Sequence, residues 1–60
     1  MNQSDFVTAL EMELQLRAVA FDRGALVTFA EDVWSLAEDD PEPIRWAEAF
    51  LIARRQAAEA

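Results

Sequence analysis

The sequence AEDDPEPIRW, residues 37–46, contains four carboxylates and both prolines of a 60-residue chain. Three interpretations compete: a metal-binding loop, a negatively charged site for a basic partner, or the corner between two helices. Asp40 is a favoured N-cap residue, and a proline directly after it suits the first turn of a helix. Pro43 also fits there, because first-turn amides have no acceptor within the helix. We therefore interpret the stretch as a corner and predict that a helix begins near Pro41.

The helix dipoles act differently on the four carboxylates of this corner. Asp40 and Glu42 lie at the start of the predicted helix, where each negative charge stabilises the helix by about 0.3–1 kcal/mol. Glu38 and Asp39 lie at the end of the preceding helix, where the dipole disfavours them. We expect solvent or an arginine of the same chain to offset these two negative charges, and a basic partner protein is the alternative. The candidate arginines are Arg17, Arg23 and Arg45. The hypothetical contact site, here called the acidic corner, consists of Glu38, Asp39, Asp40 and Glu42.

The apolar spacing on both sides of the corner is helical, without the alternation typical of strands. The predicted helices span residues 4–20, 23–38 and 41–58. Ser4 is the expected N-cap of the first helix and Asp22 that of the second, which places Gly24 in the first turn of the second helix. The alternative puts Gly24 at the C′ position of the first helix. We therefore predict an all-α fold, a compact three-helix domain with two short corners, as a single domain of residues 1–60.

The first predicted helix has apolar side chains on two opposite sides. The larger stripe includes Phe6, Leu10 and Leu14. The smaller stripe consists of Met12, Leu16 and Val19. Such a helix either lies at the centre of a bundle or contacts a partner on its outer side.

Self-association is the interpretation we favour for the smaller stripe. A chain of this length buries only about 60% of its unfolded surface, and without cysteine it has no disulfide to stabilise it. A symmetric homodimer is the simplest way to cover the stripe. Trp34, near the edge of the apolar arc of the second helix, is the fourth candidate interface residue, although a place in the core is favoured for it.

The composition argues against several classes of function. The chain has no His, Cys, Lys or Tyr, so its serines lack an activating base and a zinc site lacks its usual ligands. Calcium loops use a glycine for their sharp turn, and EDDPEP has none. The net charge of −7 opposes direct binding to nucleic acids and to anionic membranes. We expect no enzyme activity, no metal and no cofactor.

The leading hypothesis is a small intracellular protein–protein interaction module that forms a dimer and acts as a regulator or adaptor. The alternative is an acidic decoy that inhibits a basic nucleic-acid-handling protein by imitating phosphate charge. The segment MNQSDFVTAL lacks the features of a signal peptide, and no apolar run approaches the ~20 residues of a membrane span. We therefore expect a cytoplasmic location.

Overall fold

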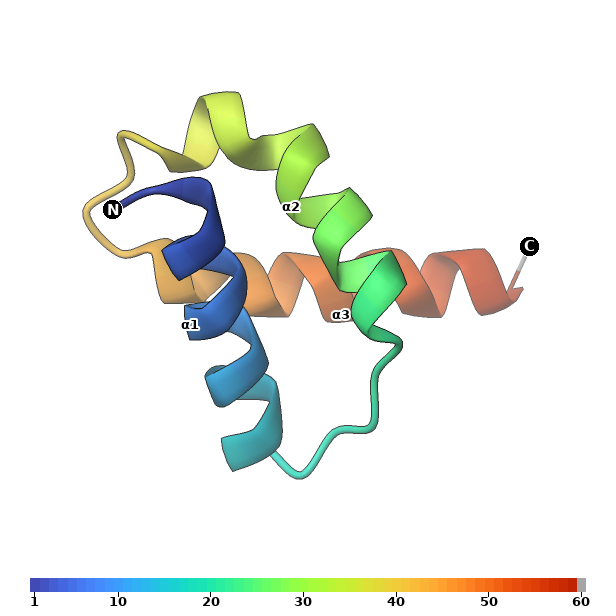
Figure 1. The fold of residues 1–60 in the computed structure, drawn as a ribbon. Coiled ribbons are helices and arrows are strands. Elements are labelled where there is room, and N and C mark those ends of the chain that lie inside the picture. The colour runs from blue at the N-terminus through green and yellow to red at the C-terminus, as the bar shows by residue number, and fades with distance from the viewer. Residues whose placement is uncertain (60) are drawn as a thin grey trace.

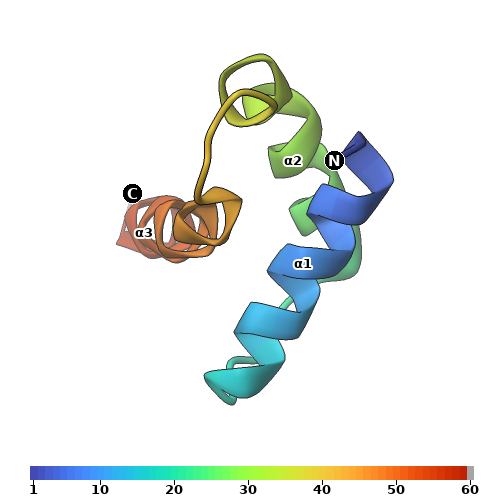
Figure 2. The same cartoon turned by 90° about the vertical axis from the view of Figure 1, so that its left-hand side faces the viewer.

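Within residues 1–59, which the structure describes, the chain forms three α-helices and one short 3₁₀ turn. This computed structural model has the order α1 (Gln3–Leu16), α2 (Arg23–Ala37), η1 (Pro43–Arg45) and α3 (Trp46–Glu59). In Figure 1, α1 and α2 form one layer and α3 crosses it; Figure 2 shows α3 nearly end-on beside that layer. The predicted all-α three-helix domain is therefore confirmed. Among the described residues, no helix combines the length and apolar character that crossing a membrane demands.

The core forms where α1 and α2 face α3. The larger predicted stripe of α1 supplies three of its fully buried side chains, Phe6, Leu10 and Leu14, and Leu26 of α2 is the fourth large one. Small side chains complete the contact, because alanine lets helices approach closely. The buried alanines are Ala30, Ala37 and Ala47.

Two aromatic pairs extend the core towards the surface. The ring centroids of Phe6 and Trp34 lie 5.6 Å apart and link α1 to α2. Those of Phe29 and Phe50 lie 5.4 Å apart in an edge-to-face arrangement that links α2 to α3. Such pairs contribute about 0.5–1.5 kcal/mol beyond the burial of their area.

The helix α1 begins earlier than expected, because Asn2 rather than Ser4 is its N-cap. The Asn2 Oδ1 atom accepts a hydrogen bond from the Asp5 amide at 2.8 Å, and asparagine ranks with serine as an N-cap. The predicted cap of α2 is confirmed: the Asp22 carboxylate accepts from the Gly24 amide at 3.1 Å. Gly24 accordingly lies in the first turn of α2.

The helix α1 also ends four residues earlier than predicted. Its end is a Schellman motif, in which the Val19 amide donates to the Leu14 carbonyl and the Ala18 amide to the Gln15 carbonyl, both at 3.0 Å. Ala18 has φ of 57°, in the left-handed region that glycine usually occupies at this position. Because no glycine marks this end, the apolar pattern alone extended the predicted helix too far.

The predicted start of the third helix at Pro41, with Asp40 as its N-cap, is wrong. The residue before a proline is kept out of the α region, and Glu42 precedes Pro43. Glu42 has φ of −127° and ψ of 70°, so helical structure begins only at Pro43. The 3₁₀ turn η1 then leads into α3 at Trp46.

We expect the substitution Ala18→Gly to stabilise the protein. A left-handed alanine costs about 1–2 kcal/mol, and the greater freedom of glycine in the unfolded chain offsets part of the gain. The expected net increase in the free energy of unfolding is about 0.5–1 kcal/mol, measured by urea denaturation. Ala20→Gly is the matched control, because Ala20 is exposed in the same loop without a positive φ. It should not stabilise, and equal stabilities of Ala18→Gly and the wild type would contradict the account.

Candidate functional site

The Asp40 carboxylate organises the corner between α2 and α3. Its Oδ2 atom accepts a hydrogen bond from the indole Nε1 of Trp46 at 3.0 Å, and its Oδ1 atom accepts from the Glu42 amide at 2.8 Å. The Arg45 guanidinium lies 3.5 Å from Oδ2, and the Asp40 side chain is only 11% exposed. All three partners belong to the corner itself, so Asp40 has a structural role that needs no external ligand.

The other carboxylates of the acidic corner are exposed to solvent. Within the described part of the chain, neither Glu38 nor Asp39 takes part in an ion pair. The three arginines considered as their partners instead pair with other carboxylates. Arg17 pairs with Glu13 and Glu48, Arg23 with Glu11, and Arg45 with Asp40. The structure therefore separates Asp40, which is engaged, from Glu38, Asp39 and Glu42, which face solvent.

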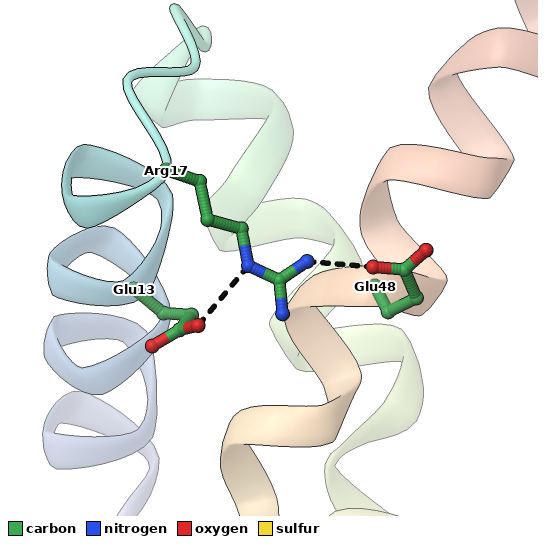
Figure 3. Close-up of polar contacts among 3 residues, drawn as sticks. All are labelled: Glu13, Arg17 and Glu48. Carbon is green, nitrogen blue, oxygen red and sulfur yellow. Dashed lines mark hydrogen bonds and ion pairs between the residues drawn. The ribbon is translucent and has the colours of Figure 1, made fainter.

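Arg17 connects the end of α1 to α3 (Figure 3). Its Nε atom lies 3.0 Å from a Glu13 oxygen, and its Nη1 atom lies 2.6 Å from a Glu48 oxygen. The hydrogen bond to Glu48, followed by the one to Glu13, raises the pKa of Arg17 above its ordinary value. Arg54 of α3 adds a second connection by donating to the Ala20 carbonyl at 2.7 Å. These contacts position the exposed C-terminal end of α1 against α3.

The four predicted interface residues fall into two pairs. Met12 and Leu16, here called the outer stripe of α1, are 58% and 82% exposed. Val19 and Trp34 are half-buried and pack against the core. Val19 was expected to continue the stripe of Met12 and Leu16, but α1 ends at Leu16. The Schellman motif then turns the chain, so the position of Val19 does not follow from the helical periodicity. The structure thus brings together Met12 and Leu16 and does not join Val19 or Trp34 to them.

Sequence reasoning missed a pocket beside α1. This corner pocket has a volume of about 550 Å³ and is lined by Met1, Ala9, Pro41, Glu42, Pro43, Ile44 and Arg45. Ala9, Met12 and Leu16 have the spacing i, i+3 and i+7, so the pocket and the outer stripe share one side of α1. Ile44, one of its lining residues, is 47% exposed. The available signal was the Pro-x-Pro spacing, which prevents a regular helix from filling this space.

A shallower groove of about 400 Å³ lies between α2 and α3. It is lined by Gly24, Ala25, Thr28, Phe29, Asp32, Phe50, Ala53, Arg54 and Ala57. Among the side chains that the structure describes, those of residues 1–58, no three acidic groups gather closely enough to hold a metal ion. Comparisons of the chain with protein-family models, with curated proteins and with solved structures gave no match.

We expect Asp40→Ala to destabilise the fold, because it leaves the partly buried Trp46 indole N–H without its acceptor. Loss of a hydrogen bond to a charged group corresponds to about 1.5–3 kcal/mol, measurable as a lower free energy of unfolding in urea. Asp39→Ala removes an adjacent, exposed carboxylate and should change that free energy by less than about 0.5 kcal/mol. Equal losses in the two variants would contradict the role of Asp40.

Proposed function

We propose that the protein is a small, non-enzymatic interaction module of the cytoplasm that self-associates through the outer side of α1 and serves as a regulator or adaptor subunit. The exposure of Leu16 carries this proposal, because it is the most exposed of the large apolar side chains in the described residues. Leucine in that position has no role in the core of the single chain. Covering it requires a second molecule.

The size of the core supports association. Among the described residues, the large buried side chains are few, namely Phe6, Leu10, Leu14, Leu26 and Phe50. Six large apolar residues of the same described part of the chain remain exposed: Met1, Met12, Leu16, Leu36, Ile44 and Ile52. A single small domain supplies little stability by itself, and natural domains of this size often compensate by oligomerisation.

The outer stripe alone would give a weak pair. In a symmetric dimer it contributes four side chains, and full burial of each is worth about 1.5–3 kcal/mol. Association costs an estimated 4–15 kcal/mol in lost translational and rotational freedom. The two terms nearly cancel, so a useful affinity needs further apolar surface next to Met12 and Leu16.

The second candidate function is the acidic decoy. The observation in its favour is the exposed acidic group at the end of α2, where Glu38 and Asp39 have no ion pair among the described residues. Residues 41–60 carry three acids and three arginines and are neutral overall, which argues against it. A decoy would lose affinity for its basic target as ionic strength rises, whereas an apolar dimer would keep or gain affinity.

We expect the wild-type chain to sediment as a dimer at tens of micromolar, at low and at high salt. Leu16→Glu should shift it to a monomer, because the substitution places a charge on each copy within the apolar contact. Leu36→Glu is the matched control, since Leu36 is also strongly exposed but lies on α2. This control should sediment like the wild type.

Two results of this sedimentation experiment would contradict the proposal. One is a wild-type monomer throughout the concentration range. The other is a dimer that Leu36→Glu disrupts and Leu16→Glu does not.

A further inference from the structure

We propose that the corner pocket of one copy receives Leu16 of a second copy, in an antiparallel, two-fold symmetric pair of α1 helices. This inference rests on the proposed function and names the surface that the outer stripe meets. The occupant is a second copy of this chain. The pocket and the side chain that fills it are then both present on every molecule, as an isologous interface requires.

The spacing along α1 permits this arrangement. Ala9, which lines the pocket, and Leu16 are seven residues apart, which corresponds to about two turns and 10.5 Å. They lie on the same side of the helix. A two-fold axis that passes between the two α1 helices, level with the midpoint of Ala9 and Leu16 and close to Met12, places Leu16 of each copy opposite Ala9 of its partner.

The pocket suits an aliphatic side chain. Its lining includes Pro41, Pro43 and Ile44, and the short side chain of Ala9 leaves space above the helix. The C-terminal half of α1 extends past α3 in both views (Figures 1 and 2), which leaves Leu16 at a projecting end of the molecule. Entry of Leu16 would also cover Ile44 and Met1, two further exposed apolar residues. This doubles the number of large apolar side chains that the outer stripe alone would bury.

The charge distribution favours a second copy over a basic partner at this surface. Each chain carries a net charge of −7, so two copies repel each other over most of their surface. On the outer side of α1, Ala9, Met12 and Leu16 carry no charge. The flanking Glu13 is paired with Arg17 of the same chain, and Asp5 lies one turn before Ala9. At the rim of the pocket, Glu42 and Arg45 have opposite charges. The middle of the proposed contact is therefore apolar apart from Glu13, whose charge is offset by Arg17 of the same chain.

The groove between α2 and α3 offers no comparable arrangement. It has Asp32 and Arg54 among its lining residues, and Arg54 is engaged with the Ala20 carbonyl and the Phe50 ring.

Mixing two complementary variants tests the inference directly. Leu16→Lys alone and Ile44→Glu alone should each weaken self-association at least tenfold, measured by sedimentation equilibrium. In an equimolar mixture, the mixed dimer contains one new Lys–Glu contact and one intact Leu16–Ile44 contact. The mixture should therefore recover an affinity within about threefold of the wild type. Ile52→Glu, which changes an isoleucine of similar exposure on α3, should associate like the wild type.

The outcomes separate the inference from the proposed function. If the wild type is monomeric, both fail, and the outer stripe then serves a different protein. If Leu16→Lys dissociates the dimer while Ile44→Glu does not, the dimer stands but the pocket is not its receiving site. The same conclusion follows if both variants dissociate and their mixture does not recover. Circular dichroism of each variant shows that the helical fold is retained and that the loss of affinity is local.

Discussion

The spacing of Pro41 and Pro43 is the constraint on which the rest of the molecule depends. Each proline keeps the residue before it out of the α conformation, so the chain cannot continue helically from α2 into α3. The freed segment crosses between the two helices, and the Asp40 carboxylate holds it there through the Trp46 indole and the Glu42 amide. The direction of α3 across α1 and α2, and with it the packing of Phe50 in the core, follows from this corner. The corner pocket follows as well, because both prolines form part of its wall.

The sequence predicted the helical elements well because their signals are periodic. The buried face of α1 and the Asp22 cap were correct, since apolar spacing and a single side-chain oxygen determine them. The end of α1 was wrong because Ala18 adopts a left-handed conformation that its residue type does not signal. The start of α3 was wrong because Pro43 restricts Glu42, an effect on the preceding residue that outweighed the favourable cap at Asp40. Both errors concern local backbone conformation, where one residue decides the outcome.

The candidate site was only partly accessible to the same reasoning. The exposure of Met12 and Leu16 agrees with a second stripe placed at 100° per residue, because both residues lie within α1, where that periodicity holds. The periodicity does not apply to Val19, which lies beyond the end of α1. The corner pocket joins α1 to residues more than thirty positions away, and a relation between such distant segments requires the tertiary structure. In the acidic corner, Asp40 is structural and the other three carboxylates are exposed. This division depends on the tertiary partners of Asp40, which the sequence does not indicate.

The central claim is that the outer stripe of α1 and the corner pocket meet across one symmetric contact. The most direct measurement is the concentration dependence of the NMR methyl signals of Leu16 and Ile44, with Leu36 and Ile52 as internal references in the same spectrum. On dilution, the signals of Leu16 and Ile44 should shift along one common curve that yields a single dissociation constant, while those of Leu36 and Ile52 stay in place. Signals of Leu16 and Ile44 that are independent of concentration, or shifts confined to Leu36 and Ile52, would contradict the claim.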